Sequence, residues 1–329
     1  MFNKKTVFVV GAGGSREVGL PMGEQLKSEI AQRVDIKFPD GYTQASGDRK
    51  ITDALRLFSE KRGERDINQY LHAGWAIAAA MPQAISIDNF LHTHSEDQYI
   101  VQIGKLGIVS SILSAERSSS IYSRRDDRIK FENVKTSWHN TFTRMLLEGV
   151  QRSRLDKVFE NVSFITFNYD RCIEHYLSHA IANYFLLDIK QAQEIVSQLT
   201  VIHPYGRVGR LPWQHGDTTG VEFGLDIHSS QMADVASQVR VFTERVEDET
   251  VVKAMHGLIA EARLVVYLGF SYGSMNLDLL SLTEAPEPRN VLGTAYNISK
   301  PNVESIIVDL KNSMGPNPAV VQSVELTHM

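Results

Sequence analysis

Cysteine is nearly absent from this sequence, whose 329 residues contain only Cys172. A single thiol forms neither an intrachain disulfide nor a four-cysteine zinc site, and it favours a reducing compartment. A long apolar run is also missing near the N-terminus, because the stretch 6–10 is too short for a signal peptide or a membrane span. We therefore expect a soluble, cytoplasmic protein with no membrane partner.

An excess of basic residues is missing as well. The 34 lysines and arginines are outnumbered by 39 aspartates and glutamates, so the formal net charge is −5 at pH 7. Such a chain has no overall field that attracts nucleic acid, and we expect no direct nucleic-acid binding. The 43% of hydrophobic residues and 22% of charged residues are ordinary for a globular enzyme.

Short apolar runs rich in β-branched residues alternate with helical patterns along most of the chain. Buried parallel strands are expected at 6–10, 162–167, 200–203, 264–268 and 291–295. Helices are expected at 22–34, 138–152, 171–185, 250–262 and 302–311, and residues 52–116 look helical throughout. The pattern predicts one α/β domain over residues 1–329, with a Rossmann-like, mostly parallel sheet flanked by helices. An all-helical insertion after the first strand is expected at residues 50–155.

Two local features stand out in the expected insertion. Ser86 and Asp88 precede an apolar helical pattern and are candidate N-caps. The segment 117–128 is rich in serine, arginine and aspartate, which is typical of a mobile, solvated loop.

A glycine-rich loop, Gly11-Ala12-Gly13-Gly14-Ser15, directly follows the first expected strand. Glycines there let the backbone approach a phosphate, and the start of the next helix supplies oriented N–H groups. The dinucleotide-dehydrogenase fingerprint needs glycine where Arg16 stands, and the lysine and hydroxyl of a P-loop are missing. Both a hydride-transfer enzyme and an NTPase are therefore disfavoured. A tight turn without a ligand is the alternative interpretation of this loop.

Three further polar or glycine-rich turns follow expected strands. They are Thr166-Phe167-Asn168-Tyr169-Asp170, His203-Pro204-Tyr205-Gly206 and Leu268-Gly269-Phe270-Ser271-Tyr272-Gly273. Each has a plain structural alternative, since Asp170 can cap the next helix, Asn168 can form an Asx-turn, and a lone histidine is often structural. Ligands of doubly wound sheets bind at the carboxyl ends of the strands. The four turns together therefore predict a ligand site at that edge.

In their order and spacing, these motifs resemble the sirtuin-like family, specifically the NAD-hydrolysing effectors of bacterial antiphage defence. The resemblance covers roughly residues 5–300 and includes Gly19-Leu20-Pro21 after the first loop. Within the helical insertion it includes Ile87-Asp88-x-Phe90-Leu91, followed by Gly104-Lys105 and Glu116.

The resemblance implies that NAD is the substrate and assigns residues to its parts. Gly11, Ala12, Gly13 and Ser15 would lie near the pyrophosphate and ribose, and Gly269 and Ser271 near the adenosine side, with the loop after Thr294 near adenine. Asn168 would be the catalytic asparagine beside the nicotinamide ribose, and Thr166 and Asp170 would support that pocket.

One position departs from the family pattern. A histidine usually stands immediately before the glycine, where this chain has Tyr205, and His203 lies two residues earlier. Residues two apart on an extended strand point to the same side, so His203 can still face the ligand. We expect His203 to act as the general base, with Tyr205 as an alternative holder of that role and a member of the binding site.

The expected reaction is cleavage of NAD+ to nicotinamide and ADP-ribose. Nicotinamide leaves as a neutral group from a cationic precursor, so no metal is expected. The alternatives are a non-catalytic subunit that binds NAD or ADP-ribose and regulates a partner, and a protein deacylase. Deacylases of this type usually carry a four-cysteine zinc module, which Cys172 alone does not supply.

An NAD hydrolase has to be restrained in its host. The resemblance therefore implies control by self-assembly into a homo-oligomer or by a separate regulatory protein, for which a nucleotide-processing partner is one option. The helical insertion and the segment 117–128 are the candidate contact surfaces.

Overall fold

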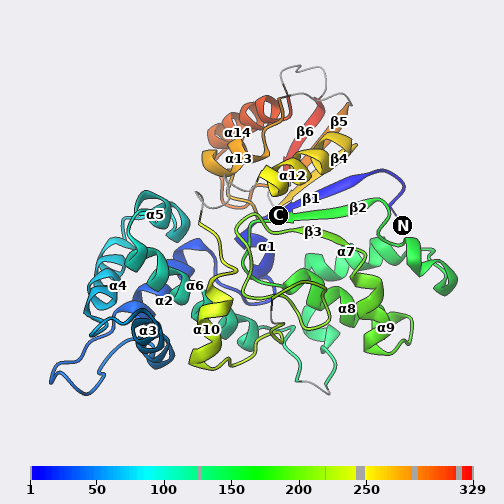
Figure 1. Cartoon of the computed structure of the whole chain (residues 1–329). Helices are drawn as coiled ribbons and strands as arrows, with labels where there is room; N and C mark the ends of the chain where they lie inside the picture. Colours follow the sequence, from blue (N-terminus) through cyan, green and yellow to red (C-terminus); the bar gives the residue numbers. More distant parts are fainter. Residues whose placement is uncertain are drawn as a thin grey trace.

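The computed structural model describes residues 2–124, 127–218, 220–241, 249–283, 288–315 and 321–327. Its centre is a six-stranded sheet of order β3-β2-β1-β4-β5-β6, in which every neighbouring pair is parallel (Figure 1). The strands are β1 (Thr6–Val10), β2 (Val162–Thr166), β3 (Thr200–Ile202), β4 (Leu264–Leu268), β5 (Arg289–Thr294) and β6 (Val321–Thr327). The expected Rossmann-like α/β fold is confirmed, and the strand order reverses between β1 and β4.

Five of these strands were expected from the sequence, and β6 was missed. Every residue of β1 and β2 is buried, because helices cover both faces of the sheet there. The strand β6 lies at the edge and pairs only with β5 among the described residues. Its sequence VQSVELT mixes polar with apolar residues and lacks the continuous apolar run that marks the central strands.

Helices cover the two faces of the sheet as separate layers. On one face, Phe8 and Val10 of β1 pack into a core with α7 (Trp138–Leu147), α8 (Cys172–Tyr184) and α9 (Ile189–Val196). On the other face, Val7 and Val9 pack into a core with α12 (Glu249–Glu261), α13 (Ser274–Leu280) and α14 (Lys300–Ser313). Alternate residues of β1 therefore face opposite layers, as the period of a strand requires.

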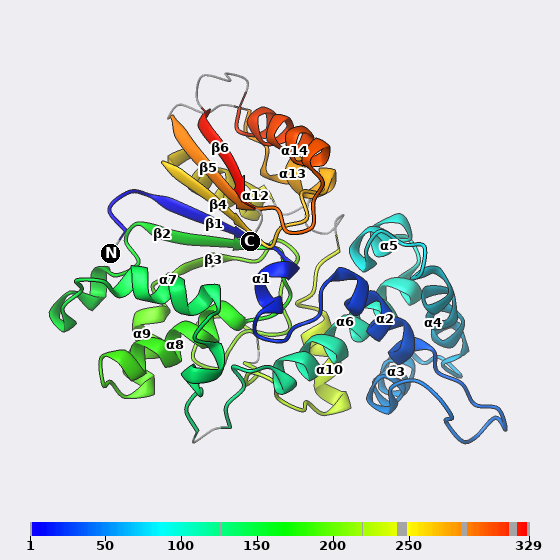
Figure 2. The same ribbon diagram turned by 180° about the vertical axis from the view of Figure 1, so that it is seen from behind.

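A group of helices stands apart from the sheet (Figure 2). It contains α3 (Arg49–Arg62), α4 (Asn68–Ala80), α5 (Ile87–Thr93) and α6 (Gln98–Ser118), all from the region expected to be helical. It also contains α2 (Gly23–Val34) and α10 (Ser229–Ala236), which pack against α6 from earlier and later parts of the chain. We call these six helices the helical lobe. The helix α7 lies within residues 50–155 but packs on the sheet.

Local signals explain several boundaries. The Ser86 hydroxyl accepts the Asn89 N–H at 3.0 Å and caps α5, as expected, whereas Asp88 lies inside that helix. The helix expected at 138–152 ends at Leu147, because Gly149 takes a φ of +70° that stops it. A 3₁₀ helix, η2, then spans Arg152–Lys157.

The loop expected at 117–128 begins slightly later, since α6 continues to Ser118. The rest of it that the structure describes has neither helix nor strand, and positions 125 and 126 lie outside the described residues. Among the helices in the described parts of the chain, none combines the length and apolar character needed to cross a membrane.

Candidate functional site

The first glycine loop folds as the short helix α1 (Ala12–Arg16), directly after β1. Most of its amides are used within the protein. The N–H of Gly11 donates to the Leu268 carbonyl at 3.0 Å, and that of Gly13 donates to the Gly269 carbonyl at 3.0 Å. The N–H of Gly14 donates back to the Gly11 carbonyl at 2.8 Å. The exposed Ala12 keeps an N–H that no described residue binds.

The two expected glycine loops are in direct contact with each other. A Cβ on Gly13 would lie 2.8 Å from the Gly269 Cα, and a Cβ on Gly269 would lie 2.0 Å from the Gly14 nitrogen. Gly269 also takes a φ of +55°, which favours glycine. The close approach of the two loops therefore requires these glycines even before a ligand is considered. A hydrogen bond of 2.8 Å from the Gly269 N–H to Thr294 Oγ1 ties the pair to β5.

Asn168 and Ser15 meet at the centre of the edge. The Asn168 Nδ2 donates to Ser15 Oγ at 3.0 Å, and both side chains are buried. The Asn168 N–H donates to Thr166 Oγ1 at 3.2 Å, which fixes the turn after β2. The Asn168 Oδ1 has no hydrogen-bond partner among the described residues, so it stays available as an acceptor. The structure thus brings together three residues that the sequence assigned to the site.

Asp170 has the capping role considered above as the alternative. Its Oδ1 accepts the Cys172 N–H at 3.0 Å at the start of α8. The next residue, Arg171, is fully buried and forms an ion pair with Glu116 of α6. Arg171 Nε lies 3.0 Å from Glu116 Oε1, and the Arg171 N–H also donates to that oxygen at 3.1 Å. This pair fastens the turn carrying Asn168 to the helical lobe.

His203 lies beside Asn168, at the end of β3. Its Nδ1 is 3.2 Å from the Asn168 carbonyl oxygen, and its Nε2 is 3.2 Å from Oε1 of Glu174. The side chain is 5% exposed. Burial alone would raise the pKa of Glu174, but His203 and Arg207 more than offset this and lower it to about 2. Glu174 is therefore ionised at neutral pH and faces the histidine as a carboxylate.

Tyr205 is buried in an aromatic cluster. Its ring centroid lies 5.8 Å from that of Phe167 and 6.3 Å from that of Tyr169. Its hydroxyl donates to Oδ1 of Asn276 in α13 at 2.7 Å. The Tyr169 hydroxyl in turn donates to Asp88 of α5. The motif singled out in the helical insertion thus contacts the turn after β2.

Several exposed groups form a rim around this edge. Ser271 is exposed, as is Ala12, and the Arg16 guanidinium lies 5.7 Å from the ring centroid of Tyr296. Arg16 belongs to α1 and Tyr296 to the loop after β5, so the contact spans the point where the strand order reverses. Arg16 was not among the expected site residues, whereas Tyr296 lies in the loop after Thr294 that was expected near adenine.

Glu174 and Asn276 were also missed. Glu174 is the acidic residue in the first turn of the helix that follows the Asn168 motif, and this position was the available signal. Asn276 gives no signal, because only the packing of α13 brings it to Tyr205.

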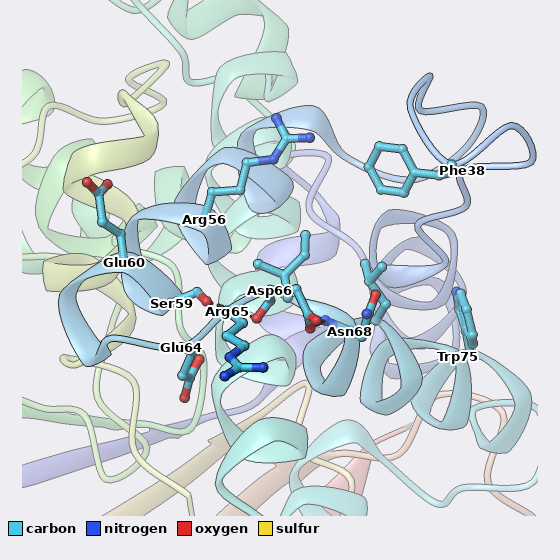
Figure 3. Close-up of a pocket in the computed structure, with 12 residues that line it drawn as sticks. Phe38, Arg56, Ser59, Glu60, Glu64, Arg65, Asp66, Asn68 and Trp75 are labelled. Atoms are coloured by element: carbon cyan, nitrogen blue, oxygen red, sulfur yellow. Dashed lines mark hydrogen bonds between the residues drawn. The ribbon is translucent and has the colours of Figure 1, made fainter.

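Two pockets lie elsewhere. One of about 600 Å³ is in the helical lobe, where Phe38, Arg56 and Trp75 line it (Figure 3). Another, of about 700 Å³, is lined by residues of α7 and α8 that include Met145 and Tyr184. Neither is lined by a residue that the sequence assigned to the site. Within the ranges that the structure describes, no group of three or more His, Cys, Asp or Glu side chains is placed to hold a metal ion.

No protein-family model matches the chain, and no curated protein matches it.

Proposed function

We propose that the chain is an NAD+ glycohydrolase that cleaves NAD+ to nicotinamide and ADP-ribose. One observation carries the proposal: the hydrogen bond of 3.0 Å between Asn168 Nδ2 and Ser15 Oγ, at the carboxyl edge of adjoining strands. It leaves the Asn168 Oδ1 as an acceptor at the edge where sheets of this order bind nucleotides. The motif order that resembles the sirtuin-like family supports the same proposal.

The groups around this pair suit the parts of NAD+. A free amide at Ala12 and the cationic Arg16 are donors for a pyrophosphate, and no described acidic residue pairs with Arg16. The exposed ring of Tyr296 can stack on a base. The Ser271 hydroxyl is exposed on the same rim. Gly11, Gly13 and Gly14 give shape to the edge, since their own N–H groups are already bonded.

The proposed chemistry needs little beyond orientation and charge stabilisation. The bond to a cationic nicotinamide breaks as positive charge develops on the ribose, in the manner of glycoside hydrolysis. Asn168 Oδ1 would accept a hydrogen bond from a ribose hydroxyl or the attacking water, and Ser15 would hold the amide in that orientation. A base role for His203 requires its ring to leave one of its two oxygen partners.

The test is release of nicotinamide from NAD+ by the purified full chain. Asn168→Ala should lower the rate by about 100-fold or more, which is the scale for losing an orienting group at a reacting centre. Asn183→Ala is the matched control, because Asn183 is exposed near the C-terminal end of α8, away from the turn that carries Asn168. Equal rates for Asn168→Ala and the wild-type protein would refute the assignment.

A regulatory subunit that binds NAD or ADP-ribose without cleaving it is the second candidate. It is favoured by the engagement of both ring nitrogens of His203 and of the Tyr205 hydroxyl within the protein. Calorimetric binding of ADP-ribose with no nicotinamide release, in the presence of every candidate partner, would support it. A deacylase is disfavoured by the single cysteine.

The biological setting is what the resemblance to the effectors of bacterial antiphage defence implies. Depletion of NAD in the cytoplasm during phage infection would halt the host cell, so the activity needs control by self-assembly or a separate protein, with a nucleotide-processing protein as one option. Control by self-assembly or by a partner is tested by measuring the oligomeric state of the chain with and without the products of neighbouring genes. The NAD+ assay is run on the same samples.

A further inference from the structure

Glu174 is the centre of a buried polar cluster next to Asn168. Three side chains converge on its Oε1: His203 through Nε2 at 3.2 Å, Arg207 through Nη1 at 3.2 Å and Gln214 through Nε2 at 3.3 Å. The other oxygen, Oε2, is buried without a hydrogen-bond partner among the described residues. The charge of this carboxylate is therefore compensated on one side only, where His203 and Arg207 lie.

His203 connects this cluster to the site through the backbone of Asn168. One ring nitrogen faces the Asn168 carbonyl oxygen and the other faces the Glu174 carboxylate, and both of these groups are acceptors. Each contact is a hydrogen bond only when the ring nitrogen concerned carries a proton. For both contacts to be hydrogen bonds, His203 has to donate in both directions, and neither nitrogen then offers the lone pair that a general base needs.

We propose that Glu174 and His203 are positioning residues, and that His203 does not act as the general base. The inference rests on the proposed function. The carboxylate of Glu174 orients the His203 ring, and this ring holds the backbone carbonyl of Asn168. The side chain of Asn168 is thereby held against Ser15. Misplacement of a reacting group by about 1 Å can cost about 100-fold in rate, so this support affects turnover without touching the substrate.

Substitutions at position 203 separate positioning from base catalysis. In His203→Asn, the amide nitrogen replaces Nδ1 as the donor to the Asn168 carbonyl, but no base remains. We expect His203→Asn to keep kcat within about tenfold of wild type and His203→Ala to lose about 100-fold. Losses of about 100-fold or more in both variants would show base catalysis and overturn the proposal.

Glu174→Gln tests the contact between the Glu174 carboxylate and the His203 ring. It keeps the shape of the side chain but removes the charge that His203 and Arg207 face, and we expect kcat to fall by about tenfold or more with little change in KM. Glu194→Gln is the control, because Glu194 is exposed on α9. A Glu174→Gln variant with wild-type kcat would refute the role of Glu174.

A readout without catalysis distinguishes this proposal from the proposed function. In protein labelled with ¹⁵N-histidine, the His203 ring should show an N–H signal from both nitrogens. These signals are assigned to His203 because they are missing from the His203→Asn variant. In Glu174→Gln the Nε2 proton should exchange faster with water. A wild-type ring with only one N–H would overturn the proposal that Glu174 and His203 are positioning residues. Failure of the wild-type chain to cleave NAD+, with both N–H signals present, would overturn only the proposed function.

Discussion

His139 should make folding sensitive to acid. It lies on α7, is only 2% exposed, and has its ring centroid 4.1 Å from that of Trp138 and 5.4 Å from that of Tyr176. Neither ring nitrogen has a hydrogen-bond partner among the described residues. Burial without a compensating partner lowers the pKa of His139 to about 3. The folded protein therefore holds this ring neutral where an unfolded chain would protonate it.

The size of the effect follows from linkage. The folded pKa lies below the ordinary value of 6.5, so the unfolded chain takes up a proton first as the pH falls. The contribution of His139 to the free energy of unfolding is fully present well above pH 6.5 and is lost progressively as the pH falls through about 6.5 toward 3. The difference of about 3.5 units corresponds to about 5 kcal/mol in total, of which about 2 kcal/mol is lost between pH 7 and pH 5.

Urea unfolding at pH 7, 6 and 5 measures this loss. His175 is also buried and His179 is half-buried, and burial lowers the pKa of both, so the wild-type decrease contains more than one contribution. In His139→Phe the decrease in the free energy of unfolding should be smaller by about 2 kcal/mol. His139→Leu gives a second variant in case the larger ring strains the core. His215→Phe, at an exposed position, is the control.

Equal decreases in wild type and in both His139 variants would refute the reasoning. That result would mean that the imidazole has a partner or water access that supports its charged form. The test bears on the site as well, because the neighbouring Trp138 donates its indole N–H to the Gly14 carbonyl.

Further outcomes test the contacts around the edge. Gly269→Ala should destabilise the fold by about 2 to 4 kcal/mol in a denaturant titration, since it adds a Cβ at positive φ against the first glycine loop. The control Gly257→Ala, in open space within α12, should be neutral or slightly stabilising in the same titration. Glu116→Gln should cost about 3 to 5 kcal/mol in urea unfolding, because Arg171 is left buried without a counter-charge; an unchanged midpoint would contradict this. Burial and neighbouring carboxylates raise the pKa of the Cys172 thiol well above its usual range, so a thiol reagent should modify Cys172 only after denaturation, and rapid labelling of the native protein would contradict its burial.

Most of the sheet was predictable because local sequence encodes it. Continuous runs such as 6–10 and 264–268 need burial on both faces, and a parallel sheet between helices provides it. The edge strand β6 was missed, because half-exposed strands carry no such run. The early end of α7 was missed because the apolar spacing continues past Gly149, and only the backbone conformation shows the stop.

The composition of the helical lobe was less predictable. The helices themselves follow from apolar spacing, but their grouping depends on contacts between distant segments. The helix α10 follows β3 in sequence and still packs against α3 and α6. No local pattern shows which layer a helix joins, because one apolar stripe fits a sheet or another helix equally well.

The sequence by itself determined where the proposed site lies. Polar and glycine-rich turns after parallel strands must meet at one edge of the sheet, and this brought Ser15, Thr166 and Asn168 together. Only the tertiary structure decided how these groups are paired, because the hydrogen bonds between them join residues far apart in the chain. Asn168 meets Ser15 across 153 positions, and His203 meets Asn168 across 35. A sequence supplies donors and acceptors, but their pairing is a property of the folded chain.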